Sequence, residues 1–86
     1  MVRKYDGKDL ARVLIYFGLI GEVTISTFNI VCPFHSDINP SMLINLDEGN
    51  FFCFGCRASG NAYDFVKYVY PELNELQVLA VLEKIL

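Results

Sequence analysis

Three cysteines and a single histidine are the residues of this chain best suited to bind a metal ion. They fall into two pairs, Cys32-x-x-His35 and Cys53-x-x-Cys56, with 17 residues between the pairs. A gap of two residues lets both members of a pair face one ion from a tight turn, and four such ligands satisfy the tetrahedral coordination of zinc. Because protein groups fill all four positions, the spacing predicts one structural Zn²⁺ with no open position for catalysis.

Two other interpretations of the cysteines are weaker. The thiols could be small buried apolar residues with His35 in a surface loop, or Cys53 and Cys56 could form a redox pair. A redox pair is expected where a strand leads into the start of a helix, and nothing around Cys53 resembles that arrangement. An odd number of cysteines would also leave one thiol over in a disulfide framework.

The elements that must position the four ligands begin with a β-hairpin. Alternating apolar residues predict a strand over 41–46, and a return strand begins at Phe51. Between them, Asp47-Glu48-Gly49-Asn50 is a strong turn signal. Such a hairpin brings the two ligand pairs together, as in a zinc ribbon, and Gly55 is expected to relieve crowding in the second tight turn.

Helices and short strands are predicted around this hairpin. The first helix has Asp9 as its candidate N-cap, and one or two short strands are expected over 23–31. A second helix, over 62–69, is capped by Asn61, and a third covers 74–85. Their expected inward faces are Leu10, Val13, Leu14 and Phe17; Phe65, Val66 and Val69; and Leu76, Val78, Leu79, Val81, Leu82 and Ile85. We therefore expect one α+β domain over 1–86, a small zinc ribbon on an antiparallel sheet flanked by helices.

Composition excludes several classes of protein. The chain of 86 residues is 53% hydrophobic, which is too apolar for a disordered chain. No apolar run reaches the roughly 18 residues that a membrane span needs, and no signal-peptide core follows the N-terminus. We therefore expect a soluble, cytoplasmic protein. The net charge of −3 argues against strong nonspecific binding of duplex DNA.

The residues around the ligands resemble the N-terminal zinc-binding domain of bacterial and phage DNA primases. The resemblance covers about residues 20–70 and is carried by Cys32-Pro33-Phe34-His35, Asp37, Pro40-Ser41, Phe52-Cys53-Phe54-Gly55-Cys56, Gly60-Asn61 and Phe65-Val66. It implies a zinc ribbon that engages single-stranded template and helps a separate RNA-polymerase domain and the replicative helicase. The chain departs from the family pattern at Asp37, where glutamate is usual, at Met42, where an aromatic is common, and at Ala58-Ser59, where glycine is more frequent.

Two functions follow from these patterns as hypotheses. The first is a module that binds single-stranded DNA and supports primer synthesis in trans with a primase catalytic subunit or helicase. Its candidate DNA contacts are Phe34, Phe54, Arg57 and Lys67, while Phe52 and Phe65 are expected in the core. The second is a protein-interaction module that binds or inhibits a replication protein without reading DNA.

An enzyme is not expected, since the chain has no acidic cluster for nucleotidyl transfer. Because the chain runs from Met1 to Leu86, we expect a free-standing zinc module, for which a phage or mobile-element genome is a plausible home. The wide apolar face of the last helix either closes the core or docks a partner or a second copy of the chain.

Overall fold

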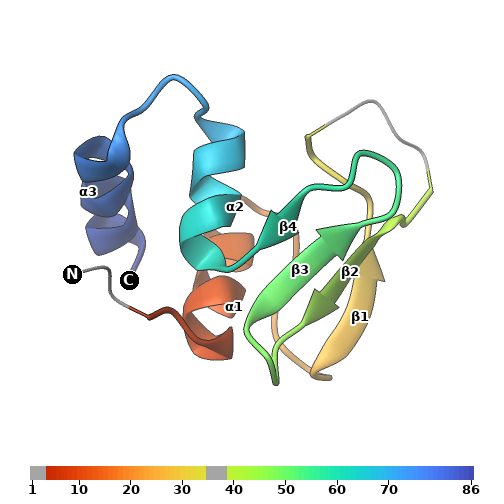
Figure 1. The fold of residues 1–86 in the computed structure, drawn as a ribbon. Helices are drawn as coiled ribbons and strands as arrows, with labels where there is room; N and C mark the ends of the chain where they lie inside the picture. Colours follow the sequence, from red (N-terminus) through yellow and green to blue (C-terminus); the bar gives the residue numbers. More distant parts are fainter. Residues whose placement is uncertain (1–3, 35–38) are drawn as a thin grey trace.

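The computed structural model describes residues 4–34 and 39–86, where three helices stand beside a four-stranded sheet (Figure 1). The helices are α1 (Gly7–Tyr16), α2 (Ala62–Val69) and α3 (Glu75–Ile85). The strands are β1 (Thr27–Ile30), β2 (Met42–Asn45), β3 (Asn50–Cys53) and β4 (Ser59–Gly60). Neighbouring strands are antiparallel and follow the chain order β1-β2-β3-β4. This architecture confirms the predicted α+β class.

The sheet has one buried face and one exposed face. Met42 pairs with Cys53 and Ile44 with Phe51, and all four side chains are buried in the core that the sheet shares with the helices. Side chains alternate between the two faces of a strand, so their neighbours point the other way. Leu43 and Phe52, a directly opposed pair, therefore lie on the outer face.

The predicted start of α1 is wrong by one turn. Asp6 is the N-cap, and its Oδ1 accepts a hydrogen bond from the backbone N–H of Asp9 at 3.1 Å. Asp9 in turn accepts from the N–H of Asp6 at 3.0 Å, so Asp9 is the third helical residue of a capping box. The sequence is ambiguous here because aspartate suits both positions of the box.

Helix α2 begins after Asn61, its predicted N-cap, whereas Asn74, predicted as the first residue of the last helix, is the N-cap of α3. Asn61 exchanges hydrogen bonds with Asp64, and Asn74 does so with Gln77. The bounds of α2 match the prediction. The predicted inward face of α3 was too wide, because Leu76 is 77% exposed while Val78 and Leu82 are fully buried.

The structure has one short strand in the stretch where one or two were expected. Of residues 23–31, only Thr27–Ile30 joins the sheet, while Val23 and Ile25 are exposed and lie outside it. The edge strand β4 was not predicted, because two residues carry no hydrophobic period.

Two glycines allow α1 to approach the turn between β2 and β3. A Cβ atom on Gly7 would overlap the carbonyl oxygen of Leu46, where β2 has just ended. Gly49 has a φ of 72°, and a Cβ atom there would lie 2.8 Å from the carbonyl carbon of Asp6. The start of α1 is therefore pressed against the end of the hairpin that lies farthest from Cys53.

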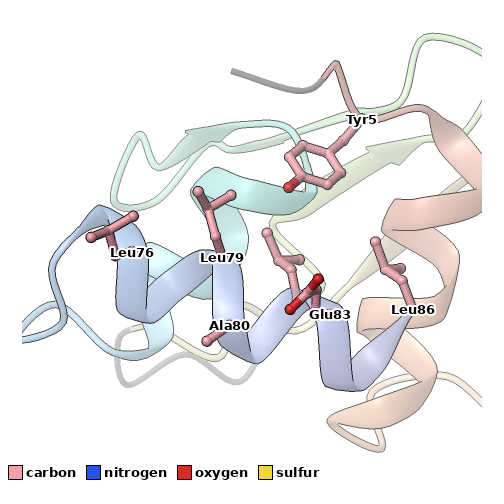
Figure 2. A pocket seen from close by; sticks show the side chains of 7 residues that line it. Tyr5, Leu76, Leu79, Ala80, Glu83 and Leu86 are labelled. Carbon is pink, nitrogen blue, oxygen red and sulfur yellow. The ribbon is translucent and has the colours of Figure 1, made fainter. Parts of the chain in front are cut away.

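Helix α3 packs on α1 and α2, and a hollow lies between α3 and Tyr5 (Figure 2). The hollow has a volume of about 370 Å³ and is lined by Tyr5, Leu76, Leu79, Ala80, Leu82, Glu83 and Leu86. The helix thus helps to close the core, and its role in self-association stays a prediction. Among residues 4–34 and 39–86, no helix is long and apolar enough to cross a membrane.

Candidate metal centre

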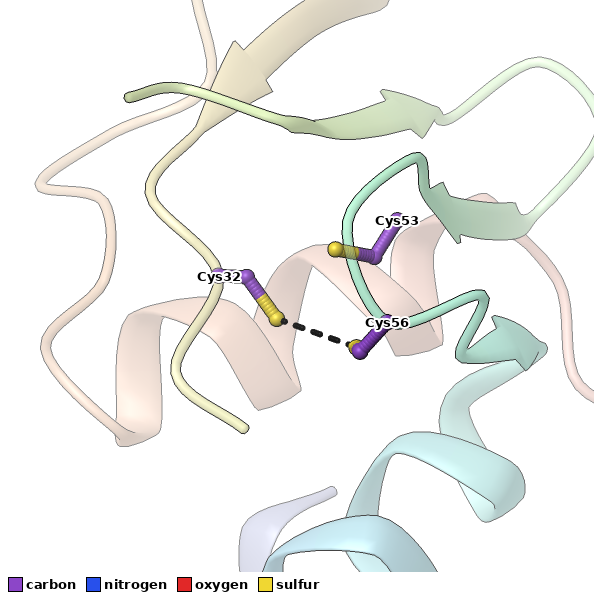
Figure 3. Close-up of side chains that lie close together, drawn as sticks. All are labelled: Cys32, Cys53 and Cys56. Carbon is purple, nitrogen blue, oxygen red and sulfur yellow. Dashed lines mark hydrogen bonds between the residues drawn. The ribbon is translucent and has the colours of Figure 1, made fainter. Parts of the chain in front are cut away.

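Three predicted zinc ligands converge where the sheet meets the loop after β1 (Figure 3). Cys53 is the last residue of β3, Cys56 lies in the tight turn that follows, and Cys32 comes two residues after β1. The three sulfur atoms lie within 4.8 Å of one another. His35, the fourth predicted ligand, and Asp37 lie outside the described residues.

The sulfur positions suit a shared metal ion better than a disulfide. Cys32 Sγ lies 3.7 Å from Cys56 Sγ, far beyond the bonded S–S length of about 2.05 Å. Four ligands with Zn–S bonds near 2.3 Å form a tetrahedron whose edges are about 3.8 Å. The distance between these two sulfurs matches such an edge, and thiolates are preferred zinc ligands.

The turn after β3 holds Cys53 and Cys56 in place. The backbone N–H of Cys53 donates to Ala58 O at 2.8 Å, and the N–H of Arg57 donates to Cys53 O at 2.8 Å. Arg57 closes the turn in the left-handed region, with a φ of 65°. Gly55 was expected to relieve crowding in this turn. The residue of the turn that has a positive φ, however, is Arg57.

Burial and hydrogen bonding act in opposite directions on the two buried thiols. Burial raises the pKa of Cys32 to about 12, although the Phe34 N–H, 3.4 Å from its sulfur, opposes the shift. Burial also acts to raise the pKa of Cys53, but hydrogen bonds outweigh it and lower that pKa to about 6. The donors are the backbone amides of Cys56 and Gly55 and the Ser41 hydroxyl, together with the thiol of Cys32. Of these two buried thiols, Cys53 therefore ionises first.

Ser41 is a neighbour of the site that sequence reasoning missed. Its hydroxyl lies 3.7 Å from Cys53 Sγ, and its carbonyl accepts a hydrogen bond from the Phe54 N–H at 2.9 Å. The Pro40-Ser41 pair was part of the primase resemblance, but its contact depends on the strand register. Ser41 faces Phe54 across the hairpin, one step beyond the Met42–Cys53 pair.

Of the four predicted DNA contacts, two are exposed and two are engaged in contacts within the fold. Phe54 is 65% exposed and meets the ring of Phe52 edge to face, with centroids 5.0 Å apart. Arg57 is also exposed. Phe34 is half-buried and contacts the rings of Phe65 and Tyr68, and Lys67 donates hydrogen bonds to the carbonyls of Pro71 and Leu73.

Of the two phenylalanines expected in the core, one lies elsewhere. Phe65 is fully buried as expected. Phe52 is 39% exposed on the outer face of the sheet, so its predicted place was wrong. The fully buried Phe51 takes the inward position next to it. In a run of consecutive aromatic residues, only the strand register tells which ring faces inward.

Comparison with known proteins identifies the family. The family model for the CHC2 zinc finger, the zinc ribbon of DnaG-type primases, matches residues 21–84. The chain belongs to this family. Zinc is therefore the metal of the cysteine cluster, and it is structural.

Individual relatives agree with the family. The DNA primase of Campylobacter jejuni is 54% identical over 41 residues, which are 48% of this chain and 7% of that protein. The DNA primase of Buchnera aphidicola (subsp. Baizongia pistaciae) is 38% identical over 58 residues, or 67% of this chain and 10% of that protein. In both cases this CHC2 zinc finger spans a tenth or less of the relative's length.

A solved structure shares the fold. The Aquifex aeolicus primase, described as containing zinc-binding and RNA polymerase domains, superposes with a TM-score of 0.64 at 28% identity. The superposition covers 95% of this chain and 21% of that one. The match thus extends beyond the cysteine cluster to nearly the whole helix-and-sheet arrangement.

Proposed function

We propose that this CHC2 zinc finger binds single-stranded DNA and supports primer synthesis in trans, in the cytoplasm, with a primase catalytic subunit or a replicative helicase. In this proposal the chain is one non-enzymatic domain. Cys32, His35, Cys53 and Cys56 hold its single zinc ion. The zinc shapes a surface and takes no part in chemistry, because four protein ligands leave no position for a substrate.

The outer face of the sheet beside the zinc turn supports this proposal. Phe52 and Phe54 stand there exposed and in mutual contact, and Arg57 lies three residues beyond Phe54. Aromatic rings exposed on a sheet offer stacking platforms for unpaired bases, and a nearby guanidinium holds phosphate. Exposed apolar residues that contact one another are typical of binding surfaces.

Phe34 and Lys67 contribute less to the proposed DNA surface. The ring of Phe34 packs against Phe65 and Tyr68, with centroid distances of 4.9 and 5.1 Å, so it is largely engaged in the fold. The amino group of Lys67 is occupied by backbone carbonyls that follow α2. The proposal therefore rests on Phe52, Phe54 and Arg57.

A fluorescence-anisotropy titration with a short, mixed-sequence single-stranded DNA tests the proposal. Each stacked base is worth about 1–3 kcal/mol, so Phe54→Ala should weaken binding by about 5- to 150-fold. Arg57→Ala should weaken binding and flatten its dependence on salt, because one phosphate contact is lost. Tyr16→Ala, at an exposed aromatic on α1, and Lys84→Ala, at an exposed cation on α3, are matched controls.

The contrary result is absence of saturable binding to single-stranded DNA at low salt by the zinc-loaded protein. The net charge of −3 would then favour the second candidate function, a module that binds a replication protein without reading DNA. Equal effects of Phe54→Ala and Tyr16→Ala would also count against the sheet face as the DNA surface.

A further inference from the structure

Positive charge gathers at one end of this acidic chain. Four of its seven lysines and arginines fall within the first twelve residues, which contain only two of its ten acidic residues. Those two, Asp6 and Asp9, are engaged in the capping box of α1, where their carboxylates accept backbone hydrogen bonds. Lys8 and Arg12 are both exposed and lie four residues apart, so they project from the same side of α1.

An apolar groove lies beside these two cations. Its floor consists of Ala11 and Ile15 from α1, Val23 from the following loop, and Leu46 from the end of β2. Gly7, Lys8 and Arg12 complete the lining, and the groove has a volume of about 390 Å³. Neither Glu22 nor Asp47, the acidic neighbours of Val23 and Leu46 in the sequence, lines it.

The groove is apolar although it is open to solvent. Ile15 is 44% exposed and Val23 is 48% exposed. The Lys8 amino group donates no hydrogen bond to residues 4–34 and 39–86, and Arg12 donates through Nη1 to Leu86 O at 3.0 Å. The backbone N–H of Lys8 and its charge act, after the stronger effect of the Asp9 N–H, to lower the pKa of the neighbouring Asp6. Exposed apolar residues beside a pair of cations are typical of grooves that bind an amphipathic helix.

We propose that this groove binds an acidic amphipathic peptide segment of a partner protein. The partner's leucine-like side chains would cover Ile15 and Val23, and its carboxylates would pair with Lys8 and Arg12. Apolar area provides the affinity, and the two cations select against basic segments. The groove is distinct from the outer face of the sheet, so this inference does not depend on DNA binding.

The probe is a synthetic helical peptide with leucine along one face and glutamate elsewhere. A second peptide, in which lysine replaces every glutamate, is the charge control. We expect saturable binding of the acidic peptide to the full zinc-loaded chain, at least tenfold tighter than that of the basic peptide. NMR shift changes should centre on Ala11, Ile15, Val23 and Leu46.

Charge reversal on the groove provides the decisive variant. Lys8→Glu with Arg12→Glu should weaken binding of the acidic peptide by at least tenfold, whereas Lys84→Glu, at an exposed cation on α3, should not. Lys8 is in the first turn of α1, where a negative charge is favoured by the helix dipole, so that substitution should not unfold the helix. Ile15→Asp should have a similar effect on binding through the apolar floor.

Three outcomes would overturn the proposal. They are lack of saturable binding, equal binding of the two peptides, and shift changes on Phe52 and Phe54 in place of the groove. A fourth would reassign the groove: if Lys8→Glu with Arg12→Glu weakened single-stranded DNA binding and left the peptide unaffected, the cations would belong to the nucleic-acid surface.

Discussion

At the scale of single residues, Ser41 links the sheet to the metal. It lies one step past the Met42–Cys53 pair, and its hydroxyl contacts the sulfur of Cys53, where it helps to lower the thiol pKa to about 6. A thiolate must lose its proton before it can bind zinc, so a group that stabilises the thiolate also favours metal binding. We therefore expect Ser41 to influence zinc affinity through Cys53.

Ser41→Ala should weaken zinc binding about tenfold, the lower end of the usual effect of a group that supports a metal ligand. Without the hydroxyl the pKa of Cys53 rises, so protons compete with zinc at higher pH. The loss should therefore be larger near pH 6 than in mildly alkaline buffer. Competition against a chromophoric chelator measures both values. Ser59→Ala, at an exposed serine in β4, is the control, and equal affinities of the two variants would contradict this role for Ser41.

At the scale of elements, the contact between α1 and the hairpin depends on a glycine. Gly7→Ala would drive a methyl group into the Leu46 carbonyl and separate α1 from the end of β2. Alanine is normally a better helix former than glycine, so helix propensity alone would make Gly7→Ala more stable. A loss of stability would therefore indicate crowding against Leu46. We expect a loss of about 1–3 kcal/mol in the free energy of unfolding, as in other overpacked sites.

Urea denaturation of the zinc-loaded protein measures this loss. Gly21→Ala is the matched control, because a Cβ atom at Gly21 would meet no atom within 4 Å. A Gly7→Ala protein that is as stable as wild type, or more stable, would show that the helix start can shift without cost.

The elements that could be predicted are those marked by residues close together in the sequence, such as turn and capping residues. The hairpin and the cap at Asn61 follow from turn residues and capping preferences, and the structure has them. The three-cysteine cluster follows from spacing alone. The outward place of Phe52 and the contact of Ser41 with Cys53 depend on strand register, which no local signal specifies.

At the scale of the whole molecule, zinc substitutes for part of the core that a small chain cannot supply. Cys32 and Cys53 belong to the same buried cluster as Phe51 and Phe65, so the metal joins the hydrophobic core to the loop after β1. Structural zinc binding is worth about 10–16 kcal/mol in small zinc-binding peptides. Domains of ordinary size are stable by only about 5–15 kcal/mol in total.

Chelating the zinc should therefore abolish cooperative unfolding. Amide exchange should accelerate most at Leu43 and Cys53, in the strands next to the cysteines, and adding zinc should restore protection. Circular dichroism during heating and hydrogen exchange monitor the two effects. Chelator already saturated with zinc is the control. An unchanged melting curve after verified zinc removal would mean that the apolar core suffices by itself.

The pairing of Met42 with Cys53 limits how such a domain can change in length. One extra residue between the turn and Cys53 would turn that sulfur to the solvent side and bring Phe52 to the inner face, which would lose the ligand and the exposed ring together. Adding a pair of residues to each strand would keep both orientations and move the metal about 7 Å farther from the turn. Lengthening of this hairpin during evolution should accordingly proceed by even numbers on each strand.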